Sequence, residues 1–177
     1  MAETPQQYTQ RILGHLEGKD PLKIQQETAK KLQKLIKPLS KKQLTYKPDA
    51  KTWSIAQVLA HLADAELVGG FRMRLIAGSN GVTIQPFDQD VWADVLNYAD
   101  CDPKVSLEAF RALRGNNLRM LKALPENVWE NHGMHQERGK ETLAHVVRMF
   151  AGHDLNHLAQ IERIAKGTGS KTKKAAA

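Results

Sequence analysis

The sequence has a single cysteine, Cys101, so no disulfide can form within the chain. A chain without disulfides suits a reducing compartment, which predicts a cytoplasmic protein. No apolar run approaches the roughly 18 residues that a membrane span needs, and residues 1–20 lack the apolar core of a secretory signal peptide. We therefore expect neither a membrane protein nor a disulfide-stapled scaffold, but a soluble globular chain.

Aromatic and arginine side chains are scarce where the chain is most basic. The net charge of +7 comes from residues 19–51 and 166–177, whereas residues 52–165 carry more acidic than basic side chains. The basic stretch has almost no side chains that stack on bases, so a solvated lysine face explains its charge better than nucleic-acid binding does. A DNA-associated protein is the third and weakest interpretation.

Four stretches repeat apolar residues at helical spacing, and no stretch has a convincing strand pattern. The four predicted helices cover residues 21–38, 54–77, 103–125 and 140–167, with shorter helices expected at 8–16, 40–44 and 91–96. This pattern predicts an all-α protein, a four-helix bundle at 21–166 between an N-terminal segment (1–20) and a flexible tail of lysine and alanine (167–177). The two long connections between helices argue against simple up-down-up-down order.

Three of the seven histidines lie on apolar helix faces. His153 and His157 are one turn apart in the last predicted helix, and His61 lies in the middle of the 54–77 helix among apolar residues. Buried polar groups are costly if left unpaired, so these imidazoles need partners. Carbonyl or Asn/Asp partners in the core are one explanation. The other is a facial set of ligands for Zn²⁺, Ni²⁺ or Fe²⁺, with sites left open for water or substrate.

Several other polar residues are candidates around such a site. Asp64 and Asp154 each lie three residues from one of these histidines and could accept an imidazole N–H, although both also read as ordinary surface carboxylates. Asn117 and Gln160 are candidate pocket residues. His15 and His145 are expected outside the metal site. His132 and His135 lie in the polar connection 125–139, where we favour a solvent-facing role, although either could reach over the site.

Two motifs resemble a known family. Trp53-Ser-Ile-Ala-Gln-Val-Leu-Ala-His61-Leu-Ala-Asp-Ala-Glu66, followed much later by Gly152-His153-Asp-Leu-Asn-His157-Leu-Ala-Gln-Ile161, looks like the DinB-like superfamily of metal-dependent enzymes. The stretches 39–44 and 139–143 also match, so the resemblance spans roughly residues 22–164. Glu66 fits the family pattern but lies about 140° around the helix from His61, so we interpret it as structural.

The resemblance implies an up-down-down-up four-helix bundle, often a homodimer, with a divalent metal held by His61, His153 and His157. It also implies that some members transfer low-molecular-weight thiols such as bacillithiol or mycothiol to electrophiles. Our first interpretation is a metal-dependent enzyme that activates a thiol or water for attack on a small electrophilic molecule. The alternative is a non-catalytic bundle that binds metal or a small molecule in a stress response.

Overall fold

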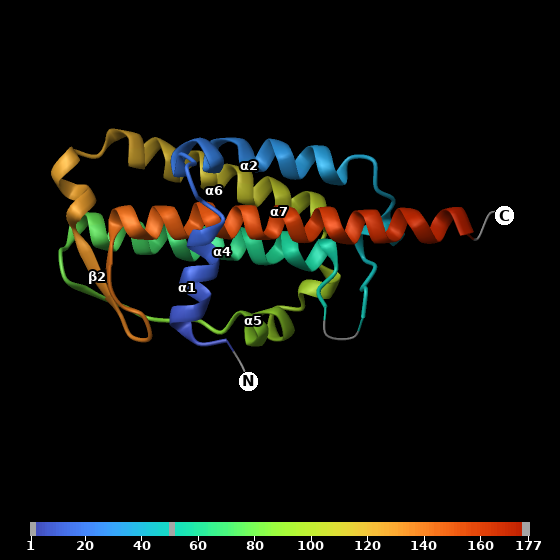
Figure 1. Cartoon of the computed structure of the whole chain (residues 1–177), viewed down its shortest axis with the longest axis horizontal. Helices are drawn as coiled ribbons and strands as arrows, with labels where there is room; N and C mark the ends of the chain where they lie inside the picture. Colours follow the sequence, from blue (N-terminus) through green and yellow to red (C-terminus); the bar gives the residue numbers. More distant parts are fainter. Residues whose placement is uncertain (1–2, 50–51, 175–177) are drawn as a thin grey trace.

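The computed structural model describes residues 3–49 and 52–174, with backbone only for 169–174. Four long helices lie side by side: α2 (Pro21–Ile36), α4 (Ile55–Gly78), α6 (Pro103–Ala123) and α7 (Leu143–Lys174). In Figure 1, α2 and α7 run in one direction and α4 and α6 in the other. Both α2 and α4 pack against α6 and α7. The predicted four-helix bundle with up-down-down-up order is therefore confirmed.

The start of α4 is fixed by the capping box that the sequence predicts. The Ser54 hydroxyl accepts the Gln57 N–H at 3.3 Å, and the Gln57 side chain accepts the Ser54 N–H at 3.0 Å. Both groups are buried, so these bonds satisfy backbone donors that the first helical turn leaves free. They set the register of the helix that carries His61.

Three short strands were not predicted. β1 (Val82–Ile84) pairs in parallel with β2 (His132–His135), which pairs antiparallel with β3 (Gly139–Thr142). The expectation of no strands is wrong here because runs of three or four residues are too short to show a period-two pattern. Residues 140–142, which were expected to begin the last helix, form β3 instead. The sheet joins the two long connections at one end of the bundle (Figure 1).

The shorter helices are α1 (Pro5–Gly14), α3 (Lys41–Leu44) and α5 (Gln89–Val95), with 3₁₀ turns at Tyr98–Asp100 and Glu126–Glu130. α1 crosses α7 and packs against it (Figure 1). α7 continues through Gly167 to Lys174, so the predicted helix end at Gly167 is wrong. One glycine lowers helix stability by only about 1 kcal/mol relative to alanine, which is not enough to end a helix. Residues 175–177 of the predicted tail lie outside the described residues.

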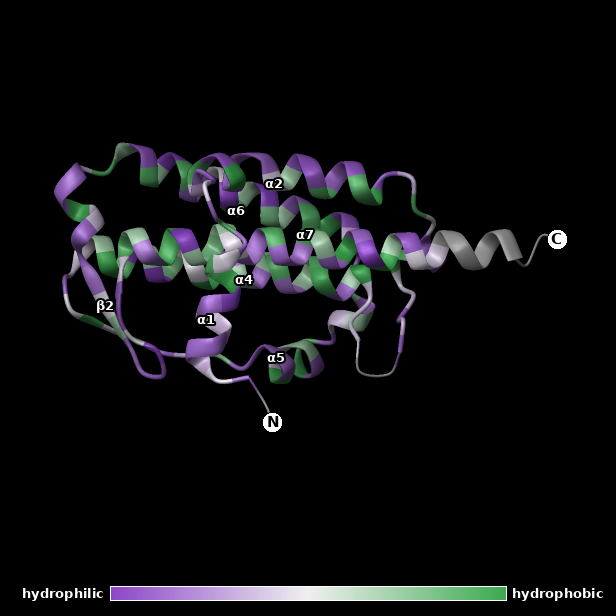
Figure 2. Cartoon of the chain, viewed as in Figure 1, coloured by the Kyte–Doolittle hydropathy of each residue, from purple (hydrophilic) through white to green (hydrophobic). Residues whose placement is uncertain are grey.

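The two largest apolar clusters of the core are separated along the bundle. On α4 one cluster uses residues between Ile55 and Ala63 and the other uses Met73 and Ile76. On α7 the same two clusters use residues 158–164 and 143–147 respectively, because the two helices are antiparallel. Figure 2 shows the hydrophobic residues turned toward neighbouring helices. The stretch between the clusters holds the buried polar residues described below.

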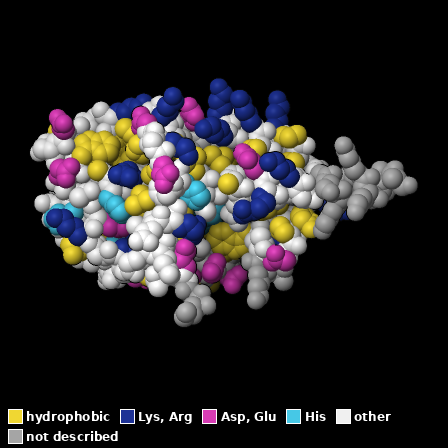
Figure 3. All heavy atoms as spheres, viewed as in Figure 1, with side chains coloured by type: hydrophobic (Ala, Val, Ile, Leu, Met, Phe, Trp, Pro, Cys, Tyr) yellow, Lys and Arg dark blue, Asp and Glu magenta, His cyan; other side chains and the backbone are white. Residues whose placement is uncertain are grey.

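Basic side chains gather along one edge of the bundle. Figure 3 shows Lys and Arg side chains projecting along the edge of the bundle where α2 lies, in agreement with the lysines of that helix. Within the described ranges, no helix is both long and apolar enough to cross a lipid bilayer.

Candidate metal centre

The three histidines on the apolar faces converge in the middle of the bundle. Nε2 of His61, from α4, is 3.0 Å from Nε2 of His153, and Nε2 of His157 is 3.1 Å from the same atom. One ligand nitrogen from each of the three lies within 4.8 Å of the other two. His61 is 1% exposed and His157 8%, whereas His153 is partly exposed and lines a cavity. Residues nearly a hundred positions apart in the chain thus form one group.

Neighbouring side chains orient two of these rings. The Nδ1–H of His157 donates to Oε1 of Gln160 at 2.7 Å, which leaves the Nε2 lone pair directed at the cluster. Gln160, a predicted pocket residue, therefore contacts the site through His157. The indole of Trp53 packs against His61 with ring centroids 5.1 Å apart. Such support limits how far the rings can rotate out of position.

The pKa values of all three imidazoles are lowered. Burial and, to a smaller extent, the neighbouring His157 lower the pKa of His61 to about 3. Burial also lowers the pKa of His153 well below its usual value, with His157 and His61 adding to the effect, and it lowers the pKa of His157. Near neutral pH the site therefore presents uncharged imidazoles, the form that binds metal ions.

The geometry fits a divalent cation. Two nitrogens each about 2.1 Å from one ion are roughly 3.0–3.4 Å apart when the angle between them is right-angled or tetrahedral. The two Nε2 separations of 3.0 and 3.1 Å fall at that spacing. Nε2 of a neutral imidazole has either one proton or one lone pair, so His153 can form a full hydrogen bond with only one of its two neighbours at a time. One cation between the three rings accounts for both short separations. The donor set therefore suits an ion that prefers nitrogen ligands.

Asp64 does not contact His61. Its carboxylate accepts a 2.6 Å hydrogen bond from the Tyr98 hydroxyl instead. Burial, followed by this bond to Asp64, raises the pKa of Tyr98. Nδ1 of His61 is buried and has no hydrogen-bond partner among the described residues. The expectation that Asp64 fixes the imidazole tautomer is not met by the geometry, because its carboxylate bonds the Tyr98 hydroxyl.

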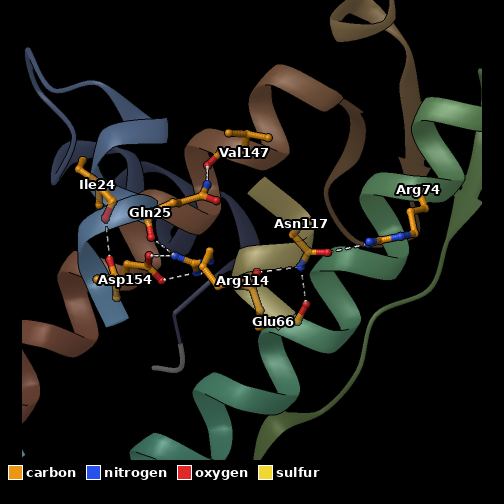
Figure 4. A network of polar contacts seen from close by, with 9 residues as sticks. Ile24, Gln25, Glu66, Arg74, Arg114, Asn117, Val147 and Asp154 are labelled. Carbon is orange, nitrogen blue, oxygen red and sulfur yellow. Dashed lines mark hydrogen bonds and ion pairs between the residues drawn. The ribbon is translucent and has the colours of Figure 1, made fainter. Parts of the chain in front are cut away.

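Asp154 also has a different partner from the one expected. It is 1% exposed and forms a two-pronged ion pair with Arg114, at 2.5 and 3.0 Å (Figure 4). The same guanidinium contacts Oε2 of Glu66 at 2.8 Å and the backbone carbonyl of Gln25 at 3.1 Å. One buried cation thus joins α2, α4, α6 and α7. The interpretation of Glu66 as structural agrees with this position.

Asn117 extends this network and is not among the residues that line the cavity beside the histidines. Its Nδ2 donates to Oε1 of Glu66 at 2.7 Å, and its Oδ1 accepts from Arg74 at 2.6 Å (Figure 4). A Cβ at Gly70 would lie 2.5 Å from the Asn117 amide, so a larger residue there would displace this amide from its hydrogen bonds. The network fixes how α4 and α7 sit against α6, and hence where His61 meets the pair on α7. A signal in the sequence was available: Arg114 lies on the apolar face of its helix, four residues after Phe110.

A cavity of about 300 Å³ opens beside His61 and His153. Its walls come from α1, α4, α7, the connection 79–102 and the β2–β3 turn. Its lining includes Tyr8, Ala65, Arg72, Phe87, His135, Arg138, Met149 and Phe150. Apart from His135, the sequence did not single out these side chains, because they come from segments far apart in the chain.

α1 covers one side of this cavity because of a close contact with α7. A Cβ at Gly152 would lie 2.2 Å from the backbone oxygen of Ile12, so only glycine lets α1 lie directly on α7 here. This crossing, one residue before His153, places Pro5 and Tyr8 in the cavity wall. Burial raises the pKa of the Tyr8 hydroxyl.

The other histidines lie outside the cluster. His145 sits 3.7 Å from a Glu141 carboxylate oxygen, and His15 caps the end of α1. For His135 the solvent-facing interpretation is wrong, because the residue is 2% exposed on β2. Its place in the cavity wall agrees with the alternative, that it reaches toward the site. Its Nδ1 accepts the Glu137 N–H at 3.2 Å.

Fold and site together define a class of protein: an up-down-down-up four-helix bundle with a three-histidine cluster beside an open cavity. The chain belongs to the DinB superfamily, whose family description matches residues 25–161. The matched part includes all three histidines.

The names of similar proteins agree on one reaction class. The chain is 25% identical over 150 residues to "Putative metal-dependent hydrolase YfiT" of Bacillus subtilis, covering 84% of each chain. It is 27% identical over 135 residues to "Putative metal-dependent hydrolase OB0782" of Oceanobacillus iheyensis, covering 76% of this chain and 78% of the relative. The solved structure of YfiT, titled a probable metal-dependent hydrolase with an unusual four-helix bundle topology, matches with a TM-score of 0.79 at 21% identity. That match covers 95% of this chain and 91% of the other, and it supports the fold.

Proposed function

We propose that this protein is a metal-dependent hydrolase that binds a divalent ion such as Zn²⁺, Ni²⁺ or Fe²⁺ through Nε2 of His61, His153 and His157. The observation that carries the proposal is the convergence of three unprotonated imidazoles, two pairs of them 3.0 and 3.1 Å apart, at a cavity. The names of the relatives support hydrolysis as the reaction class.

Residues of this chain bind the metal ion, orient its ligands and shield the site from bulk water. The three imidazoles provide neutral nitrogen ligands on one side of the ion and leave the cavity side for a small molecule. Gln160 keeps the His157 lone pair directed inward, and Met149 and Phe150 add apolar wall that limits entry of bulk water. A divalent ion bound there lowers the pKa of a water or thiol ligand toward neutrality and polarises a carbonyl group.

In the overall reaction, the oxygen of water forms a bond to an electrophilic carbon of the substrate. The bond from that carbon to the leaving group breaks, and the leaving group takes up a proton. A low-molecular-weight thiol in place of water would make the same cavity a thiol-transfer site, with sulfur forming the new bond.

Metal analysis tests the ligand set. Protein purified without an affinity tag should contain about one divalent ion per chain, and the triple variant His61→Ala, His153→Ala, His157→Ala should contain almost none. His132→Ala is the matched control, since it removes a histidine outside the cluster and should leave the metal content unchanged. Equal metal content in the wild type and the triple variant would defeat the proposal.

Activity tests the reaction class. The metal-loaded protein is incubated with activated esters and amides, with and without a chelator, and in parallel with monochlorobimane and a thiol such as cysteine. Chelator-sensitive hydrolysis supports the hydrolase. Thiol conjugation without hydrolysis would identify a transferase, and a rate equal to background in both assays would identify a non-catalytic metal-binding bundle.

A further inference from the structure

The cavity extends along the bundle, because its lining residues follow one another along two antiparallel helices, α4 and α7. On α4, His61, Ala65 and Arg72 lie on one face, and eleven residues correspond to roughly 16 Å of helix. On α7, His153 stands opposite the His61 end, and the ring of Phe150 packs where a Cβ of Gly69 would be. The cavity therefore runs from the histidine cluster, past an apolar middle, to Arg72.

Arg72 is a cation without a carboxylate partner. Its guanidinium donates to the backbone carbonyl of Gln85 and lies over the ring of Phe87 at 5.5 Å from the centroid. No acidic side chain of the described ranges lies within ion-pair distance of it. Burial and the neighbouring Arg138 lower the pKa of Arg72 by more than the carboxylates of Glu141 and Glu137 raise it, so an added anion would relieve an unfavourable environment.

The other charges at this end are already compensated or exposed. Arg138 is held by Glu141 at 2.7 and 3.0 Å, and Glu3 is held by Arg11 at 2.8 and 2.9 Å. Glu137 is exposed at the rim. One uncompensated, half-buried positive charge therefore remains, which matches a single carboxylate better than a doubly charged phosphate.

His135 adds an unused hydrogen-bond donor to the same wall. Because its Nδ1 accepts the Glu137 N–H, the ring proton of the neutral imidazole is on Nε2. That Nε2 is buried and has no hydrogen-bond partner among the described residues. A buried donor without a partner is costly, and a ligand oxygen would satisfy it.

We infer that the substrate is a small carboxylic acid whose carboxylate pairs with Arg72 while its hydrolysable group lies at the histidine cluster. Only the placement of the hydrolysable group at the histidine cluster rests on the proposed function. Because arginine side chains on a helix lean toward its N-terminus, the two ends of the ligand are separated by roughly 10 Å, an apolar spacer of several carbons. The fork of Arg72 is suited to a carboxylate, and its charge selects against the neutral analogue.

Binding tests the acid subsite without any need for turnover. Calorimetry with monomethyl suberate, a carboxylate with a neutral ester at its far end, is compared with dimethyl suberate on the wild type, Arg72→Met, Arg72→Lys and Arg119→Met. Arg72→Met should weaken binding of the monoacid about 10-fold to 100-fold and leave binding of the diester unchanged. Arg72→Lys should retain part of the affinity, and Arg119→Met, an exposed arginine outside the cavity, should match the wild type.

Metal-loaded and metal-free protein are both titrated, since a carboxylate can also bind a metal ion. Equal affinity for monoacid and diester, no measurable binding of the monoacid, or loss of its binding on metal removal with Arg72→Met unaffected would each overturn the inference. Hydrolysis of 4-nitrophenyl hydrogen suberate against 4-nitrophenyl octanoate is measured in parallel. Binding that depends on Arg72 without hydrolysis would support the acid subsite and contradict the proposed hydrolase. Hydrolysis that does not depend on Arg72 would support the hydrolase and contradict the acid subsite.

Discussion

Replacing Arg114 by methionine should destabilise the protein severely, because it strands two buried carboxylates. Arg114 is 2% exposed, and Glu66 and Asp154 are each 1% exposed. The substitution removes both contacts to Asp154, the contact to Glu66 and the bond to the Gln25 carbonyl. Methionine can still pack on the ring of Phe110, over which the guanidinium lies at 4.7 Å, so the loss is mainly electrostatic.

The expected cost is about 3–5 kcal/mol, the usual range for removing one partner of a buried ion pair. Glu66 keeps its hydrogen bond from Asn117, so the expected loss of stability is smaller than the sum of the lost contacts. With a urea m-value of about 2 kcal/mol/M, the midpoint of unfolding should fall by about 2 M. Circular dichroism at 222 nm in urea measures it directly.

A triple variant separates stranded charge from lost packing. Adding Glu66→Gln and Asp154→Asn to Arg114→Met removes both charges, so at least half of the lost stability should return. The exposed Arg119→Met should stay within about 0.5 kcal/mol of the wild type. The electrostatic explanation is refuted if Arg114→Met costs less than about 1 kcal/mol, or if the triple variant is no more stable than the single one.

Three further predictions concern the site. Gln160→Leu should weaken metal affinity about 10-fold to 100-fold in a competition titration, because His157 loses its orienting acceptor, whereas Gln160→Glu should keep the affinity. Gly152→Ala should displace α1, since its Cβ meets the Ile12 backbone, and so raise hydrogen exchange in residues 5–14. The metal-free protein should lose stability as pH falls from 6.5 toward 3, because the unfolded chain takes up a proton on His61 that the buried imidazole does not. A His61→Phe variant should show a shallower fall.

Each of these three predictions has an outcome that would contradict it. Equal metal affinity of Gln160→Leu and the wild type would show that the ring of His157 is held by packing alone. Unchanged exchange in α1 of Gly152→Ala would show that the two helices separate without loss of docking. Parallel pH profiles for His61→Phe and the wild type would assign the acid sensitivity to other groups.

The sequence was most informative where side chains repeat along one helix. His61, His153 and His157 could be found because each sits on an apolar face, where a polar ring needs an explanation. The partners of Asp64 and Asp154 could not be found in this way, because spacing along a helix does not show which neighbouring helix supplies a hydroxyl or a guanidinium. Arg72 was missed for a similar reason, since its role depends on a loop and a hairpin turn that only the folded chain brings near α4.

The end of the chain nearest the histidines has a practical consequence for anyone handling the protein. Glu3 and Thr4 line the cavity, whereas α7 carries the other terminus away from it (Figure 1). A polyhistidine purification handle fused ahead of Glu3 would bring extra imidazoles to the mouth of the cavity and compete for any ion there. Fusions intended for biochemical work belong at the carboxyl end, after Ala177.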